Sequence, residues 1–240
     1  MIQDSLNSSP SSTPIGRERF SLTFLLLTVT FCVCLIISNL MEIKTVDLGF
    51  MTITAGVAVF PLSYIINDCL VEIYGFRKAR MVIFLGFTMN LLTVLLLHVG
   101  LWLPGDESWT QQDAMQAIFS AAPRILCASF TAFLAGSLTN AWVMARMKQS
   151  ASESGKNATS MSRFSARAIL STVWGEGIDS IIFFPMAFAG TLPWSVILSL
   201  ILTQTVLKTV YEIIALPLTV MLVRKLRRME YSPAIISASR

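Results

Sequence analysis

The sequence predicts an all-α integral membrane protein with six transmembrane helices in one bundle. Three observations support this fold class: 54% of the residues are hydrophobic, only 13% are charged, and the apolar residues gather in long runs. A soluble domain is about one quarter charged, so about half of the expected charge is missing. The mean hydropathy of +0.68 agrees and excludes a disordered chain, a nucleic-acid-binding module and a typical cytosolic enzyme.

Six runs of about 20 mainly apolar residues follow one another along the chain. The first, residues 20–41, carries no charge and lacks the cleavage site of a signal peptide, so it is predicted to be a membrane span. The other five spans are predicted at residues 51–73, 79–103, 124–146, 167–190 and 194–223. We therefore predict one transmembrane domain over residues 20–228, with a disordered cytoplasmic tail at 1–19 and a cytoplasmic C-terminal tail at 229–240.

The basic residues predict the orientation of these helices. Of the 18 Lys and Arg residues, all but Lys44, Arg124 and Lys208 lie in or at the edges of the N-terminal tail, the second and fourth connections and the segment after the last span. Cytoplasmic segments of membrane proteins carry an excess of Lys and Arg, so both termini are expected in the cytoplasm. The net charge of +4 is then a topology signal, and no nucleic-acid partner is expected.

Motifs for metals, cofactors and common catalysis are missing from the sequence. The cysteines, Cys32, Cys34, Cys69 and Cys127, lie in apolar runs without the spacing of a metal site. The chain also lacks a Walker A loop, Rossmann glycines, an HExxH helix and a GxSxG elbow. We therefore expect no metal and no cofactor, and we exclude ATP hydrolysis, dinucleotide chemistry, zinc proteolysis and serine hydrolysis.

Several charged side chains fall in or at the edge of the predicted spans: Asp68, Glu72, Glu176, Asp179, Lys208 and Glu212. A charge at the centre of a membrane helix costs about 3 kcal/mol, so these groups are expected to face one another or a polar cavity. Lys208 and Glu212, four residues apart, could simply neutralise each other. Acids without such a partner are typically ion, proton or substrate sites in membrane proteins.

Helical spacing places the polar groups on shared faces. The repeats of about one turn are Tyr64, Asp68 and Glu72; Thr172, Glu176, Asp179 and Phe183; Gln204, Lys208 and Glu212; and Arg124, Ala128, Ala132, Gly136 and Asn140. Pro61 is expected to kink the second helix toward the interior. The fourth repeat is small in its middle, which allows another helix or a ligand to come close.

Two functional classes are compatible with these residues. An intramembrane aspartyl protease would use Asp68 and Asp179 as a pair that shares a proton, but the chain has one residue too many between Gly175 and Asp179 for the GxGD segment of such proteases. A transporter accounts for more of the sequence. An acid-rich pocket between helices that Pro and Gly interrupt suits a small polar, flat or cationic solute.

Four ordered segments carry a more specific resemblance. They are residues 60–80 (FPLSYIINDCLVEIYGFRKAR), 124–130 (RILCASF), 171–184 (STVWGEGIDSIIFF) and 208–217 (KTVYEIIALP). In these segments, and over about residues 38–228 as a whole, the chain resembles the queuosine precursor transporter family, also called the vitamin uptake transporter family. The resemblance implies import of 7-cyano- and 7-aminomethyl-7-deazaguanine across the bacterial inner membrane, for queuosine salvage in tRNA. It also implies a fold similar to the substrate-binding subunits of energy-coupling-factor transporters.

The chemistry of such a solute agrees with the residue types. A guanine-like edge presents N–H donors that a carboxylate accepts in pairs, and an aromatic ring can stack on the base. We expect a carboxylate to bind that edge and Gln204 or Asn140 to bind the carbonyl. The expected substrate-binding set is Asp68, Glu176, Asp179, Tyr64, Asn140, Gln204 and Trp174, with Glu72, Lys208, Glu212 and Arg124 as a coupling or structural charge network.

The sequence is compatible with two energy sources, a proton gradient and a separate ATPase. Energy-coupling-factor subunits dock to separate ATPases through an alanine motif on the first helix, whereas residues 20–41 contain no alanine. This favours a solitary carrier driven by protons through Glu72 or Glu176. A substrate-binding subunit of an ATP-driven vitamin uptake system is the alternative, and the sequence does not predict an oligomeric state.

Overall fold

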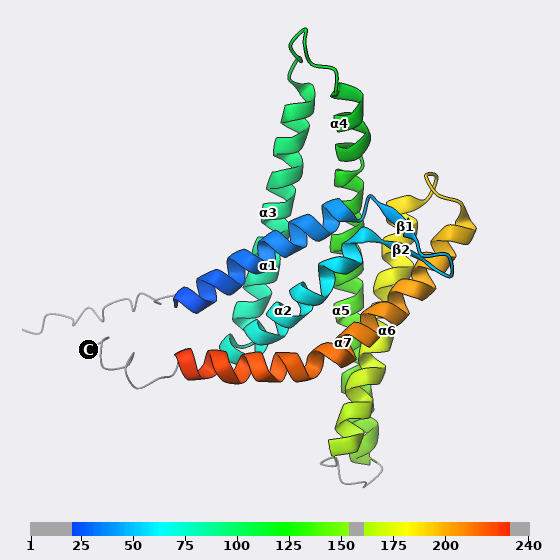
Figure 1. Cartoon of the computed structure of the whole chain (residues 1–240). Coiled ribbons are helices and arrows are strands. Elements are labelled where there is room, and N and C mark those ends of the chain that lie inside the picture. Colours follow the sequence, from blue (N-terminus) through cyan, green and yellow to red (C-terminus); the bar gives the residue numbers. More distant parts are fainter. Residues whose placement is uncertain (1–20, 154–160, 231–240) are drawn as a thin grey trace, which may run out of the picture.

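The chain is mostly helical in its computed structural model, which describes residues 21–153 and 161–230. The elements are α1 (Leu22–Met41), β1 (Thr45–Asp47), β2 (Thr52–Thr54), the 3₁₀ helix η1 (Ala55–Ala58), α2 (Phe60–Tyr74), α3 (Phe76–Trp102), α4 (Gln112–Phe119), α5 (Ala122–Glu153), α6 (Met161–Phe188) and α7 (Trp194–Glu230). Figure 1 shows α4 and α5 following one another along the long axis of the molecule, with α3 beside their upper part, α6 beside their lower part, and α1, α2 and α7 running across this axis. The tail predicted at 1–19 and residues 231–240 lie outside the described residues.

Four helices of the described chain are long and apolar enough to cross a membrane. They are Leu22–Met41, Phe76–Trp102, Gln112–Asn140 and Trp194–Ala215. Large apolar side chains such as Leu26, Leu96 and Leu202 are exposed on them, as expected of surfaces that face lipid. Helix α6 has 28 residues but carries two acids in its middle, and it is not among the four.

The second predicted span, residues 51–73, is wrong at its start. Strands β1 and β2 form an antiparallel hairpin, with Thr45 opposite Thr54, and Gly49 makes the turn with a φ of +83°. Helix α2 follows with 15 residues, about 22 Å of helix, whereas the bilayer core is about 30 Å thick. The all-α prediction is therefore corrected to a mostly helical fold with one small hairpin.

Pro61 begins α2 and does not kink it. It lies in the first turn of the helix, where its missing N–H has no partner to lose. The predicted kink is therefore wrong. Pro185 and Pro217 do lie inside α6 and α7. Proline removes a hydrogen bond inside a helix, which accounts for a change of direction along α7 (Figure 1).

Two buried apolar clusters hold the helices together. One joins α1, α2, α3 and α5 and includes Phe31, Leu70, Val82, Phe87 and Leu126. The other joins α5, α6 and α7 and includes Ile125, Ala132, Phe184, Ile197 and Leu200. Because α5 contributes to both, it lies between these two groups of helices, and a smaller third cluster around Cys69 packs α2 against α7.

Helices α5 and α6 approach each other closely at two glycines. A Cβ atom added to Gly136 would lie 2.8 Å from the carbonyl oxygen of Gly175, and one added to Gly175 would lie 2.9 Å from Cβ of Asn140. Real Cβ atoms do not come this close. The small residues predicted to admit a helix or a ligand therefore admit a helix, α6, and hold Asp179 of α6 against α5.

Candidate functional site

Two adjoining cavities lie between the apolar clusters. The first, of about 80 Å³, is bounded by Glu42, Phe60, Gln204 and Lys208, and also by Phe87 of one cluster and Phe184 of the other. The second, of about 180 Å³, is bounded by Asp68, Asn140, Thr172, Glu176 and Glu212. Tyr64, Asn67, Phe133 and Asp179 line both. Each cavity is smaller than the roughly 300–1,000 Å³ of drug-sized ligand pockets, so the pair suits a small solute.

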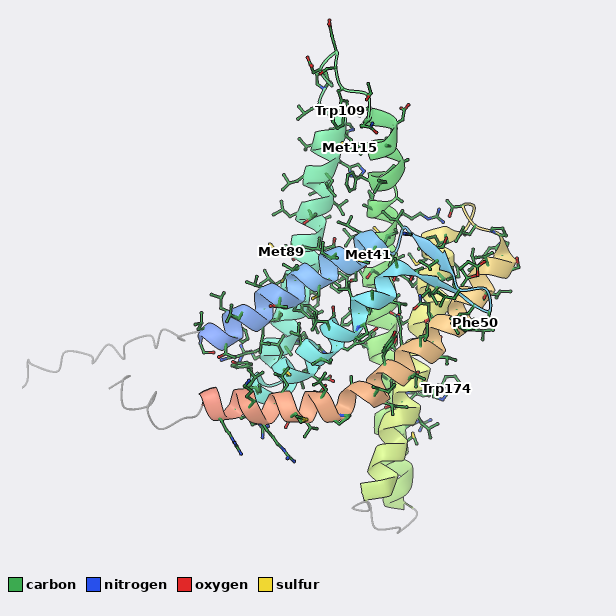
Figure 2. The ribbon with its side chains drawn as sticks, in the orientation of Figure 1. Met41, Phe50, Met89, Trp109, Met115 and Trp174 are labelled. Carbon is green, nitrogen blue, oxygen red and sulfur yellow. The ribbon has the colours of Figure 1, made fainter. Side chains whose placement is uncertain are left out.

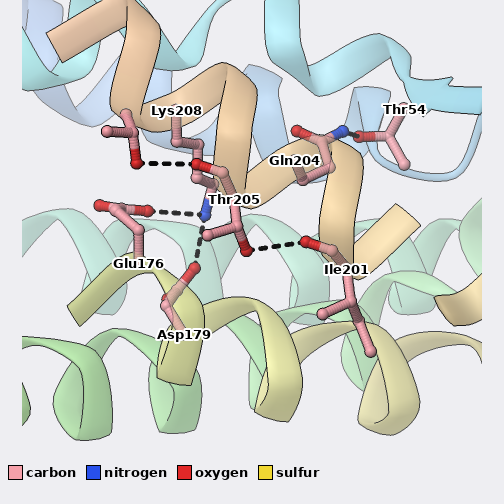
Figure 3. Close-up of polar contacts among 8 residues, drawn as sticks. Thr54, Glu176, Asp179, Ile201, Gln204, Thr205 and Lys208 are labelled. Carbon is pink, nitrogen blue, oxygen red and sulfur yellow. Dashed lines mark hydrogen bonds and ion pairs between the residues drawn. The ribbon is translucent and has the colours of Figure 1, made fainter. Parts of the chain in front are cut away.

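Lys208 of α7 lies between the two acids of α6 (Figure 3). Its Nζ is 2.5 Å from Oδ2 of Asp179 and 3.3 Å from Oε2 of Glu176. The side chain of Lys208 is only 10% exposed, so the pair is largely removed from solvent, where such an interaction must offset the desolvation of both charges. Lys208 therefore joins α7 to α6 across the site.

Glu212 has a different partner from the one that its spacing indicates. Its Oε1 accepts a hydrogen bond from Oγ1 of Thr172 at 3.0 Å, while Lys208 is directed to Asp179 and Glu176. The interpretation that Lys208 and Glu212 simply neutralise each other is therefore wrong. Glu212 belongs to the second cavity, opposite Thr172 of α6.

Asp68 is the carboxylate that α2 contributes to the second cavity. Among the described residues no ion pair reaches it. Its neighbours on the cavity wall include Glu176, Asp179 and Glu212. Lys208 pairs with Asp179 and Glu176 only, so the four acids leave the site with a formal excess of negative charge.

Gln204 and Thr54 join α7 to the hairpin at the first cavity. Gln204 is fully buried, and its Nε2 donates to Oγ1 of Thr54 at 2.7 Å (Figure 3). This contact holds the end of β2 on α7. It also places Gln204 in the wall of the cavity next to Lys208.

Glu42 is a site residue that the sequence reasoning missed. It follows the last residue of α1, lines the first cavity and is only 1% exposed. Because Glu42 directly follows the charge-free run 20–41, the sequence assigns it to a connection between spans, where acidic residues are common. A usable signal was present, because Glu42 is the first charged residue after that run and it precedes a segment that folds back onto the bundle.

The first cavity is lined by buried polar atoms without hydrogen-bond partners. They are Oε2 of Glu42, Oγ of Ser63, Oδ1 of Asn67 and Oε1 of Gln204. Buried polar atoms in proteins nearly always have a partner. Three of the four are acceptors, and the fourth, a hydroxyl oxygen, can also accept. This wall therefore suits a molecule rich in N–H donors.

Trp174 lies away from both cavities. It is 59% exposed, lines neither cavity and projects from the outer side of α6 (Figure 2). A residue two positions from Glu176 faces a different side of the helix. Its expected role in binding relied on nearness in sequence, and the structure does not bring it to the other predicted site residues.

Two members of the predicted charge network have structural contacts outside the cavities. Arg124 donates from Nε to the carbonyl of Met186 at 2.6 Å and from Nη2 to that of Ala189 at 2.5 Å, so it caps the C-terminal end of α6. Nη2 of Arg227 lies 2.6 Å from Oε1 of Glu72 and also donates to the Glu72 carbonyl at 2.9 Å. Arg124 thus joins α5 to the end of α6, and Glu72 joins the end of α2 to α7.

Comparisons with known proteins agree with this architecture. A family model described as "Putative vitamin uptake transporter" matches residues 54–222. A protein of Bacillus subtilis (strain 168) named "Probable queuosine precursor transporter" is 28% identical over 187 residues, which cover 75% of this chain and 76% of that protein. No solved structure matches the chain. The chain belongs to the vitamin uptake transporter family; it is a multi-pass membrane transporter and not an enzyme.

Proposed function

We propose that this transporter imports the queuosine precursors 7-cyano- and 7-aminomethyl-7-deazaguanine across the bacterial inner membrane for queuosine salvage. The observation that carries the proposal is the pair of small cavities lined by carboxylates and by unpartnered acceptors. The name of the relative from Bacillus subtilis supports the same solute class.

A deazaguanine matches the cavity walls in its chemistry. It presents N–H donors along its guanine edge and at its pyrrole nitrogen, and the aminomethyl form adds a cation. The acid-rich second cavity, with Asp68 and Glu212, suits the cation or a donor. Tyr64 and Phe133 line both cavities and offer aromatic faces to a flat ring.

Asp68, Glu176 and Asp179 have unequal roles in this proposal. Asp179 and Glu176 already neutralise Lys208, whereas Asp68 has no cation of its own among the described residues. Asp68 is therefore the member of the set that is free to accept from the solute. Asp179 and Glu176 hold Lys208 in position and exchange it for the solute as α6 and α7 move.

The proposed topology has six crossings within a domain of residues 20–228, with both termini in the cytoplasm. The contact between Arg227 and Glu72 supports it, because it joins the ends of α7 and α2 that the basic residues assign to the cytoplasmic side. Short or interrupted helices next to the binding site, here α2 and the proline-containing α6, are a common feature of transporters.

For energy coupling we propose a solitary, proton-driven carrier in which Glu176 carries the proton. The other carboxylate considered for this role, Glu72, is engaged by Arg227 at the surface. Uptake into vesicles that contain only the purified protein, with and without a proton gradient, tests this step. Gradient-dependent uptake supports it. Uptake only after a separate ATPase module is added would favour the substrate-binding subunit of an ATP-driven system.

The solute assignment is tested in cells that depend on precursor salvage. We expect Asp68→Asn and Asp179→Asn each to abolish accumulation of 7-cyano-7-deazaguanine while the protein remains in the membrane. Asp113→Asn is the matched control, because Asp113 is exposed in the first turn of α4. Normal uptake by Asp68→Asn at normal expression would refute its role, and absence of uptake by the wild-type protein would refute the function.

A further inference from the structure

Glu42 and Gln204 line the first cavity, and Thr54 hydrogen-bonds Gln204 behind it; the three residues come from separate elements. Glu42 directly follows α1, Thr54 ends β2 and Gln204 lies in α7. All three are buried to at least 99%. Because they are far apart in sequence, no helical repeat links them, and only the fold brings them together.

The hydrogen bond between Gln204 and Thr54 has a defined direction. An amide nitrogen donates and does not accept, whereas a hydroxyl oxygen can accept. Thr54 must then accept from Gln204, as its 2.7 Å contact with Nε2 indicates. This hydrogen bond fixes the orientation of the Gln204 amide, so that Oε1 remains without a partner.

Two acceptors in the wall of the first cavity remain unpartnered. Oε2 of Glu42 and Oε1 of Gln204 are both buried without a hydrogen-bond partner, and both residues line the cavity. No ion pair within the described chain reaches Glu42. By contrast, Asp179 and Glu176 already share the ammonium of Lys208.

Packing holds the Glu42 carboxylate in place. Gly56 of η1 lies against it so closely that an added Cβ would collide with Oε1 and Cδ of Glu42 and would lie 3.0 Å from the carbonyl oxygen of Ser38. The φ of Gly56 is not in the left-handed region. The carboxylate therefore occupies the space beside Gly56, and a Cβ at this position would displace the end of the Glu42 side chain.

We propose that Glu42 is a specificity-determining residue that binds, together with Gln204, a pair of adjacent N–H donors on a flat heterocyclic solute. The guanine edge of a deazaguanine, with its ring N–H and its 2-amino group, has this pattern. The proposal rests on the proposed function and deepens it. It also revises the role expected for Gln204, which presents an acceptor and not a donor to the solute.

The test compares two solutes that differ only in the donor pair. Uptake of labelled 7-cyano-7-deazaguanine by purified protein in vesicles is competed with the unlabelled compound and with its analogue that lacks the 2-amino group. Wild-type protein should prefer the 2-amino compound by about 10- to 100-fold, because a hydrogen bond to a charged acceptor is lost with the analogue. A wild-type preference below about threefold would overturn the proposal without any variant.

Two variants then assign the preference to Glu42. Glu42→Gln keeps the shape and removes the charge, while Gly56→Ala keeps the carboxylate and displaces it. Both should raise the KM for 7-cyano-7-deazaguanine by about tenfold or more and reduce the preference for the 2-amino compound. Glu107→Gln, in an exposed loop, is the matched control and should behave as wild type.

The outcomes separate the inference from the function on which it rests. If wild-type protein does not take up 7-cyano-7-deazaguanine, the proposed function fails. If wild-type protein transports it and a folded Glu42→Gln variant keeps the same KM and preference, the inference about Glu42 fails and the function stands. A lower maximal rate with unchanged KM and preference would indicate a merely structural role for Glu42 and would also overturn the inference.

Discussion

Among the residues that the structure describes, helix α7 makes ionic contacts with other helices at two places, and the surroundings of these places differ sharply. Near its middle, Lys208 joins Asp179 and Glu176 of α6, and these side chains are 10%, 19% and 18% exposed. Near its end, Arg227 joins Glu72 of α2, and these side chains are 50% and 59% exposed. The same kind of bond thus occurs once at a cavity and once at the surface.

We interpret this difference in burial as a difference in role: the buried contact serves transport, and the exposed contact only joins two helices. An exposed ion pair contributes little stability, about 0–1 kcal/mol. A buried pair is costly to desolvate and becomes strongly destabilising when one partner is removed. Burial makes the Lys208 cluster a costly way to join two helices, and its place beside both cavities supports the transport role that we propose for it.

Removing Lys208 should have the largest effect on both stability and transport. Lys208→Met leaves Asp179 and Glu176 together without their cation, and loss of one partner of a buried pair costs about 3–5 kcal/mol. We expect a strongly lowered unfolding temperature in detergent and no uptake. Arg227→Met is the matched control and should lower stability by no more than about 1 kcal/mol. Equal effects of the two substitutions would show that burial does not distinguish the contacts.

Removing both partners of the buried contact should separate stability from function. The double variant with Lys208→Gln and Asp179→Asn carries no unpaired ammonium, so its loss of stability should be smaller than the sum of the two single losses by about 1–3 kcal/mol. Uptake should remain absent in the double variant, because the charges themselves serve transport. A double variant that regains uptake would show that the cluster is only structural.

Two glycines of α6 distinguish helix packing from the ionic contact. Gly175→Ala should destabilise the protein by about 1–3 kcal/mol, because its Cβ would lie 2.9 Å from Cβ of Asn140 and overpacking is costly. For Gly177, the nearest atom to an added Cβ is Cγ2 of Thr205 at 4.0 Å. Gly177→Ala should therefore be neutral or stabilising by about 0.5–1 kcal/mol. The measurement is the thermal unfolding of both variants. Equal destabilisation by Gly175→Ala and Gly177→Ala would contradict the close crossing of α5 and α6.

The surface contact should give the smallest effect. Glu72→Gln removes the charge but leaves the hydrogen bond from Arg227 to the Glu72 carbonyl, which is 2.9 Å long. We expect a change of about 0–1 kcal/mol in the free energy of unfolding and an unchanged rate of uptake with and without a proton gradient. Loss of the response to the gradient in this variant would assign proton coupling to Glu72 instead of Glu176.

Sequence reasoning identified much of the second cavity because its residues repeat along single helices. Asp68, Glu176, Asp179 and Glu212 are rare charges in apolar runs, and the cost of burying them is large enough to predict that they meet. Periodicity of about one turn then assigned each acid to a face. The structure brings all four to one cavity, together with Asn140 of the predicted set.

The first cavity could not be predicted in the same way. Glu42 and Thr54 belong to a connection and a short hairpin, where no period marks a buried face. The hairpin itself was hidden because residues 51–58 are as apolar as the helix that follows them. The partner of Lys208 was also missed, because spacing along α7 reveals only neighbours within that helix, whereas the actual partners lie on α6.

The central claim is that the solute binds in the cavity between the two apolar clusters, and a cysteine at its wall tests this directly. Ser63 lines the first cavity and has an unpartnered hydroxyl. Cys127 is the exposed native cysteine, while Cys32, Cys34 and Cys69 are buried. The test therefore places Ser63→Cys in a Cys127→Ser background, and Ser108→Cys in an exposed loop is the control.

The measurement is the rate of maleimide labelling of each cysteine in the purified protein, with and without 7-cyano-7-deazaguanine. Our account predicts that the compound slows labelling at position 63 in proportion to its occupancy and leaves position 108 unchanged. Saturable binding of the compound with no protection at position 63 would contradict the claim that this cavity is the binding site.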